Sequence, residues 1–140
     1  KASEFHAAMG LCMFPHIEQI IADRKILTAT YDEYLFAAET VLKKPSLSKE
    51  VTYNYAYYPI LFQTTEQLLM VRDSLNAAYV YPRRYFYPSL NTLNYIEQEQ
   101  QMPVSESVSS RVLCLPLFGE LSTDNIRRIC NIINEVLRYN

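Results

Sequence analysis

The sequence has few glycines, and this shortage excludes several kinds of phosphate site. Among 140 residues there are 2 glycines, Gly10 and Gly119, where average usage of about 7% would give roughly ten. Loops that hold phosphate through backbone amides need several glycines close together. The chain therefore has neither a P-loop nor a dinucleotide-binding fingerprint.

Long apolar runs and a strong net charge are also missing. No apolar run approaches the roughly 18 to 20 residues that cross a bilayer, and we expect no signal peptide. The formal net charge is −2 and the pI is about 5.7, so we expect neither nucleic acid nor membrane as a partner. A chain of this length fits one domain with a real core, and we expect it in the cytoplasm.

Cysteine and histidine are scarce, and neither is arranged for chemistry. The 3 cysteines, Cys12, Cys114 and Cys130, are an odd number and lie far apart in sequence. A disulfide framework or zinc site needs closely spaced ligands, so we predict buried, reduced thiols in a reducing cytosol. The two histidines, His6 and His16, lie in segments with a helical pattern and are not part of a nucleophile-elbow motif. We also predict no metal site.

The spacing of apolar residues predicts the secondary structure. We expect a short helix from Ser3, a break near Phe14-Pro15 and a long helix to about Phe36. The later elements are a loop at 37–51, a strand at 53–62, a helix capped by Thr64 and Gln67, a strand at 79–87, a loop at 89–104, a short helix at 105–110, a strand at 112–115 and a helix after Ser122. Pro59 predicts an edge or a bulge in the first strand.

This order of elements predicts the fold class. It is that of an α+β domain with a small, mostly antiparallel sheet covered by helices on one face and preceded by two helices.

Tyrosine is plentiful, with 12 copies, and eight of them lie in two short stretches. In the first stretch, strand alternation would put Tyr53, Tyr55 and Tyr57 on one side. The second stretch begins at Tyr79, and its residues 81–88 set Arg83 and Arg84 among aromatic rings. Arginine binds phosphate through two parallel hydrogen bonds and tyrosine rings offer stacking surface, so these stretches could bind a nucleotide diphosphate or single-stranded nucleic acid. Tyrosine also simply favours strands, and the residues alone leave both readings open.

Four segments resemble one protein family. Residues 1–11, KASEFHAAMGL, resemble the pattern N-x-K/R-M-S-E-x-x-A-A-x-G-L of the DegT/DnrJ/EryC1/StrS sugar aminotransferases, with Ala2 where methionine is usual. Arg24, Tyr31 and Leu35 are similar to the family's R-x6-Y-x3-L helix. Residues 81–91 resemble its substrate-facing loop, and residues 111–122 with the final helix resemble its closing L-P-L-x-x-x-L-S/T motif. The likeness runs from end to end.

The resemblance implies a fold-type-I enzyme that depends on pyridoxal phosphate (PLP) and is active as a homodimer. Such an enzyme transfers an amino group from glutamate to a nucleotide-linked keto-sugar, here expected to be a dTDP-4-keto-6-deoxyhexose, in surface-polysaccharide or deoxysugar biosynthesis. Residues 1–36 would then be the terminal helices of the large domain and an interdomain helix, and residues 37–140 the small C-terminal domain.

The same resemblance implies that the catalytic lysine is missing from this chain. In the family the lysine that forms the Schiff base precedes the first motif by some tens of residues. Lys25, Lys43, Lys44 and Lys49 all follow that motif, in helix or loop. Since the chain opens at Lys1 without methionine and is soon helical, we expect the C-terminal part of a longer protein. We expect it to be inactive alone and to bind no PLP.

Candidate site residues also follow from the resemblance. Lys1 has the basic position that approaches the cofactor phosphate of the neighbouring subunit. The residues expected to face the sugar nucleotide are Arg83, Arg84, Tyr85 and Tyr87, and those expected to line the same cleft are Tyr53, Asn54 and Tyr55. Many relatives carry a histidine in the 81–91 loop that this sequence lacks.

Two other functions remain open at this point. A stand-alone module could use Arg83 and Arg84 on a nucleotide or on single-stranded nucleic acid, although the acidic net charge disfavours the latter. A relic of the enzyme could also do no more than dimerise through exposed apolar surface.

Overall fold

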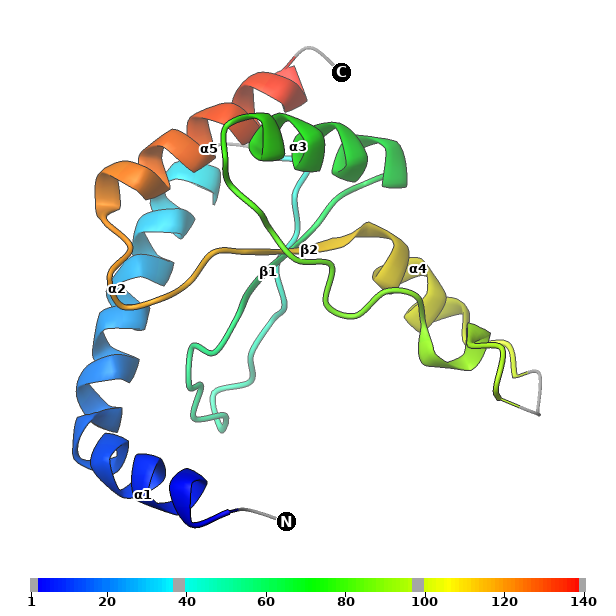
Figure 1. Ribbon diagram of the computed structural model, residues 1–140. Coiled ribbons are helices and arrows are strands. Elements are labelled where there is room, and N and C mark those ends of the chain that lie inside the picture. Colours follow the sequence, from blue (N-terminus) through cyan, green and yellow to red (C-terminus); the bar gives the residue numbers. More distant parts are fainter. Residues whose placement is uncertain (1–2, 37–39, 97–99, 139–140) are drawn as a thin grey trace.

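The computed structural model describes residues 3–36, 40–96 and 100–138. Its elements follow the predicted α+β order (Figure 1). They are α1 (Glu4–Met13), the 3-10 helix η1 (Phe14–His16), α2 (Ile17–Phe36), β1 (Tyr58–Leu61), α3 (Thr65–Ala77), the 3-10 helix η2 (Leu90–Thr92), α4 (Pro103–Arg111), β2 (Val112–Leu115) and α5 (Thr123–Arg138).

The first two helices begin and break where the sequence predicts. The Ser3 hydroxyl accepts a hydrogen bond from the backbone amide of His6, which caps the start of α1. Pro15 lies in η1, the short 3-10 segment between α1 and α2, because proline is tolerated best in a first turn. In α2 the buried residues are Leu27, Tyr31 and Leu35, a four-residue spacing that keeps them on one face.

The sheet is small and antiparallel, with Tyr58 opposite Leu115 at one end and Leu61 opposite Val112 at the other. Single bridges extend it on both sides: Leu61 pairs with Lys43, and Cys114 pairs with Arg83. The backbone amide and carbonyl of Cys114 both form hydrogen bonds with Arg83, at 2.8 and 3.0 Å respectively. Its partner in β1, Pro59, therefore needs no amide hydrogen toward β2. Proline is therefore tolerated here, in agreement with the expected edge position.

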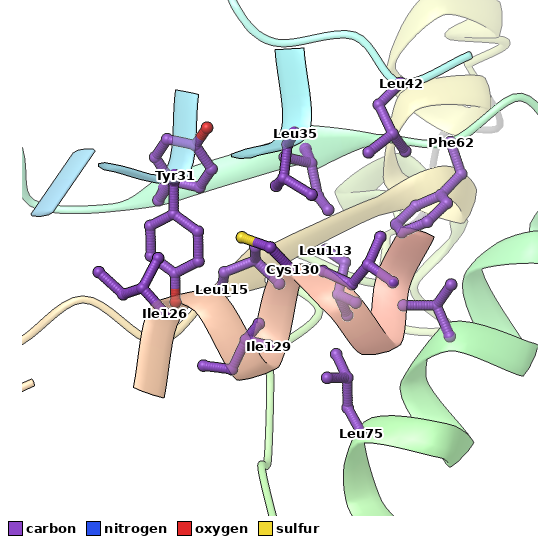
Figure 2. Close-up of a cluster of buried hydrophobic side chains, with 14 of the residues drawn as sticks. Tyr31, Leu35, Leu42, Phe62, Leu75, Leu113, Leu115, Ile126, Ile129 and Cys130 are labelled. Carbon is purple, nitrogen blue, oxygen red and sulfur yellow. The ribbon is translucent and has the colours of Figure 1, made fainter. Parts of the chain in front are cut away.

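Three helices cover the sheet and enclose the core. Side chains from α2, α3, α5 and both strands converge on one another, and Figure 2 shows Tyr31, Leu75 and Cys130 among them. In α5 the buried residues are Ile126, Ile129, Cys130 and Ile133, a three- and four-residue spacing that places them on one face of the helix. The fold-class prediction is confirmed, and α4 and β2 lie at the predicted places.

The two predicted tyrosine-rich strands are largely wrong. Of residues 53–62 only Tyr58–Leu61 form a strand. Before it, Asn54 accepts a hydrogen bond from the amide of Ala56, and Tyr55 has a positive φ of 51°, so strand alternation stops there. Residues 79–87 form a single bridge at Arg83, because this segment opens in the left-handed backbone region at Tyr79 and contains Pro82.

The cysteine prediction is partly wrong as well. Cys114 and Cys130 are buried, whereas Cys12 is exposed, because no described element covers α1. Burial raises the pKa of the Cys130 thiol to about 12, so this residue remains an uncharged core side chain. In the described part of the chain, no group of three histidine, cysteine or acidic side chains is arranged for a metal. Nor is any helix there long and apolar enough to cross a membrane.

Candidate functional site

A hollow with a volume of about 650 Å³ lies beside β2 and the start of α5. We call it the arginine hollow, because Arg83 and Arg128 both line it. Four tyrosines and Asn125 supply the rest of its polar groups, and there is no acidic side chain among its lining residues. The tyrosines are Tyr57, Tyr79, Tyr81 and Tyr85. The hollow therefore favours an anionic ligand with a flat ring or sugar attached.

Arg83 and Tyr85 are held in this hollow by the sheet. The backbone of Arg83 exchanges two hydrogen bonds with Cys114 of β2, which fixes where its side chain begins. Its Nη1 donates to the Tyr85 hydroxyl at 2.6 Å, and the Tyr85 ring meets Tyr57 edge-on with centroids 5.4 Å apart. This bond uses one of five guanidinium donors, so Arg83 keeps most of its binding capacity.

Arg84 and Tyr87 point elsewhere and contact each other. The Arg84 guanidinium lies 3.6 Å from the centre of the Tyr87 ring, and its Nη2 donates to the Ser110 carbonyl of α4. Neither residue is among those that line the arginine hollow. The contacts fasten the loop to α4, so a direct role in binding substrate stays a prediction for this pair.

Tyr53 and Tyr55 line a second hollow of about 450 Å³, here called the lysine hollow. Their rings meet edge-on at 4.9 Å, and the Tyr53 hydroxyl donates to the Tyr57 carbonyl at 2.7 Å. The side-chain oxygen of Asn54 accepts a hydrogen bond from the amide of Ala56 within the local turn. Arg83 and Tyr85 thus line one hollow and Tyr53 and Tyr55 line another, while Tyr57 lines both. A single cleft shared by these residues stays a prediction.

The lysine hollow is built around one carboxylate, that of Asp32. It accepts from the Lys44 amine at 2.6 Å and from the Tyr58 hydroxyl at 2.7 Å. The Tyr58 ring stacks on Tyr31, with centroids 4.6 Å apart. Burial raises the pKa of Tyr58 well above its ordinary value, and the hydrogen bond to Asp32 adds to this, so the phenol remains a proton donor at neutral pH.

The part of the arginine hollow that β2 contributes is uncharged. Cys114 lines it, and burial raises the pKa of its thiol above 9.0, so at neutral pH it carries a proton and is a poor nucleophile. The two guanidinium groups are then the charged groups that line this hollow. Their positive charge faces it without a neutralising carboxylate among the lining residues.

Sequence reasoning missed Arg128, Asn125 and Tyr79. Arg128 and Asn125 lie in α5, which the apolar pattern describes only by its buried stripe. Arg128 donates from Nη2 to the Ala78 carbonyl at 3.0 Å, which fastens it beside the end of α3. The available signal was the pair Arg127-Arg128 in a helix whose other face is buried, but the sequence does not say which of the two faces the hollow.

The chain matches one known protein family. The model of the DegT/DnrJ/EryC1/StrS aminotransferase family matches residues 1–134. The chain belongs to this family. Aminotransferases of the family depend on pyridoxal phosphate in general.

Curated relatives in the family act on nucleotide-linked sugars. The chain is 30% identical over 142 residues to the dTDP-4-amino-4,6-dideoxy-D-glucose transaminase of Escherichia coli, covering 95% of this chain and 38% of that protein. It is 30% identical over 129 residues to the GDP-perosamine synthase of Escherichia coli O157:H7, covering 92% and 35% respectively. The chain thus spans less than two fifths of the length of these relatives.

Solved structures show the same fold. DesI, whose structure was determined in the presence of its TDP-sugar product, is 27% identical, with a TM-score of 0.86 over 99% of this chain and 36% of that one. The aminotransferase TlmJ from Streptoalloteichus hindustanus is 20% identical, with a TM-score of 0.86 over 96% of this chain and 36% of that one. At 20% identity the second likeness bears on the fold alone.

The residues of the two hollows do not fit pyridoxal phosphate by themselves. The cofactor needs a lysine amine free to bond to it. No lysine lines the arginine hollow, and in the lysine hollow the Lys44 amine is 2.6 Å from the Asp32 carboxylate. Lys1, the predicted contact to the cofactor phosphate, lies outside the described residues.

Proposed function

We propose that this chain is the C-terminal part of a longer PLP-dependent aminotransferase that aminates a nucleotide-linked keto-sugar. Its amino donor is glutamate and its acceptor a dTDP-4-keto-6-deoxyhexose, in surface-polysaccharide or deoxysugar biosynthesis. The whole enzyme works as a cytoplasmic homodimer. Residues 1–36 belong to its large domain and interdomain helix, and residues 37–140 form its small domain.

The observation that carries this proposal is the arginine hollow within a chain of this family. A nucleotide-linked sugar has a diphosphate, and Arg83 and Arg128 face the hollow with no acidic side chain in its lining. Family membership over residues 1–134 supplies the reaction class, and the E. coli relative named for a dTDP-linked amino sugar supports the choice of nucleotide.

Within this proposal the candidate residues have different roles. Arg83 and Tyr85 contact the sugar nucleotide from the arginine hollow, because both line it. Arg84 and Tyr87 contribute by fastening the same loop to α4. Tyr53, Asn54 and Tyr55 shape the neighbouring wall, and Lys1 approaches the cofactor phosphate of the partner subunit. The cofactor-bearing lysine belongs to the part of the enzyme that precedes Lys1.

The reaction itself is tested on the product of the whole open reading frame that contains this chain. The purified protein is mixed with pyridoxal phosphate, glutamate and dTDP-4-keto-6-deoxyglucose, and the amino sugar is measured by mass spectrometry. GDP- and UDP-linked keto-sugars serve as alternative acceptors. Failure to aminate any of the three would contradict the proposal.

The role of Arg83 is tested in the same assay by Arg83→Gln. Loss of a charge-assisted contact should raise the KM for the nucleotide sugar roughly 10- to 100-fold and leave the KM for glutamate unchanged. The matched control is Arg72→Gln, because Arg72 lies on α3 and pairs with its neighbour Asp73. An equal rise in both variants would remove Arg83 from the site.

A further inference from the structure

Tyr79 occupies a backbone position that usually belongs to glycine. Its φ is 62°, and it directly follows Ala78, the C-cap of α3. The amide of Val80 bonds to the Leu75 carbonyl at 2.9 Å and that of Tyr79 to the Asn76 carbonyl at 3.0 Å. These two bonds define a Schellman motif, whose left-handed residue is most often glycine because a Cβ there is strained.

The tyrosine ring at this position is not explained by packing. Tyr79 is 84% exposed, so little burial offsets the strain of a bulky residue in the left-handed region. It also lines the arginine hollow. A strained, exposed aromatic residue at the rim of a hollow indicates that the ring has a use outside the fold.

Arg128 gives a second, independent observation at the same hollow. It comes from α5, whereas Arg83 comes from the loop beside β2, so two separate elements bring guanidinium groups to one place. Within the described residues, no carboxylate lies within ion-pair distance of either group. Arg127, the neighbour of Arg128, instead pairs with Asp124 and donates to the Tyr34 hydroxyl.

We propose that the arginine hollow is the site for the nucleoside diphosphate end of the substrate. The ring of Tyr79 stacks on the base, and Arg128 together with Arg83 binds the two phosphates. The assignment rests on the proposed function, since it takes the substrate to be a nucleotide-linked sugar. It goes beyond that function by naming Tyr79 as a binding residue and by assigning the base to Tyr79 and the phosphates to Arg128 together with Arg83.

The dimensions and charge of the hollow fit this ligand. About 650 Å³ is within the range of roughly 300–1,000 Å³ typical of small-molecule sites. Stacking on a tyrosine ring tolerates any base, while guanidinium forks bind the oxygens of anionic groups such as phosphate. A free sugar has neither a flat base nor a negative charge, so it would use neither feature.

The test measures binding to the 140-residue chain by titration calorimetry at low salt. The probes are thymidine diphosphate, inorganic pyrophosphate and glucose. We expect the diphosphate to bind more tightly than pyrophosphate, and glucose not to bind. Arg128→Gln should weaken both anionic probes roughly tenfold or more, and Arg127→Gln, on the next residue of the same helix, should leave both unchanged.

Variants of Tyr79 distinguish the effect of its ring on ligand affinity from its effect on stability. Tyr79→Gly should weaken thymidine diphosphate roughly 5- to 150-fold by removing a stacking ring, and leave pyrophosphate unchanged. The same change should raise Tm by roughly 2–4 °C because glycine relieves the left-handed strain. Tyr79→Ala should lose the affinity without the gain in Tm. Tyr95→Ala, at another exposed tyrosine, should change neither property.

Three results would overturn the assignment. They are no binding of thymidine diphosphate to the unmodified chain, unchanged affinity in both Tyr79→Gly and Arg128→Gln, and equal weakening by Arg127→Gln. Failure of the proposed function would look different, because the whole enzyme would then transfer no amino group while the chain still bound the diphosphate through these two residues. Amino transfer with a KM insensitive to Arg128→Gln would reject the site and keep the function.

Discussion

The first helix, α1, and the last helix, α5, are both rich in apolar residues but differ in burial. No residue of α1 is buried, whereas four residues of α5 are. Figure 1 shows α1 at the far end of the molecule from α3 and α5, with Phe5 84% and Met9 66% exposed. Apolar composition alone therefore does not decide burial, since a helix needs a partner to cover it.

The difference in burial between α1 and α5 indicates which part of the chain supplies its stability. Isolated helices shorter than about 12–15 residues are marginal in water, and α1 has 10 residues. The core formed by α2, α3, α5 and the sheet must then carry cooperative folding. Changes in that core should have large effects on unfolding, while equivalent changes in α1 should have almost none.

The largest expected effect is that of Ile133→Ala. Ile133 is fully buried in α5, and truncation of a buried isoleucine costs about 2–5 kcal/mol through lost contacts and the cavity left behind. Phe5→Ala removes a larger side chain from α1 and should change the free energy of unfolding by less than about 0.5 kcal/mol. Urea unfolding of both variants measures the contrast. Similar losses would mean that α1 is part of the cooperative unit.

A smaller effect is expected from Tyr31→Phe, which keeps the ring and removes one hydrogen bond. The buried Tyr31 hydroxyl donates to the Pro116 carbonyl at 2.9 Å, tying α2 to the segment that leads into α5. Loss of this donor should cost about 1–2 kcal/mol. Tyr95→Phe, at a tyrosine that is 76% exposed, is the matched control and should unfold like the unmodified chain. Equal stability of the two variants would show that the bond contributes nothing.

A still smaller effect, confined to α1, is expected from Gly10→Ala. An added Cβ at Gly10 meets nothing within 4 Å, and alanine in a helix interior is better than glycine by about 1 kcal/mol. Hydrogen exchange should slow in α1, while the unfolding midpoint of the core stays constant. A matching shift of that midpoint would contradict the separation between α1 and the core.

The parts of the fold that follow from local chemistry were predictable from the sequence. The break at Pro15, the cap at Thr64 and the buried stripe Ile126, Ile129 and Ile133 depend on residues a few positions apart. The strands at 53–57 and 79–87 failed because tyrosine favours strands but does not enforce one. Asn54 and the left-handed residue Tyr79 determined the outcome, and a left-handed tyrosine has no sequence signature.

The candidate site was predictable only in part for a related reason. Arg83 and Tyr85 stand in a motif that marks them as candidates, and they do share a hollow. Arg84 is adjacent and chemically identical to Arg83, yet it contacts Tyr87 and Ser110 instead. Arg128 lies 45 positions further along than Arg83, and only the packing of α5 beside the loop brings the two to one hollow.

The smallest effect concerns Glu106, in α4. Its carboxylate accepts from the Met102 amide at 2.8 Å and from the Asn91 side chain at 2.6 Å. These bonds, the amide first, hold the pKa of Glu106 below its ordinary value of 4.5. A lowered pKa means that the stabilisation is present above the pKa of the unfolded chain and is lost as pH falls through the folded value.

We therefore expect the contact between η2 and α4 to loosen below about pH 4.5, while the core around α5 persists to lower pH. Amide shifts of Met102 and Asn91, followed by NMR between pH 6 and 2.5, measure this change. Glu106→Gln keeps one acceptor oxygen and removes the charge, so the same amides should lose their pH dependence in that range. Glu120→Gln, on the exposed loop before α5, is the control. A pH dependence that survives in Glu106→Gln would assign the acid response to another carboxylate.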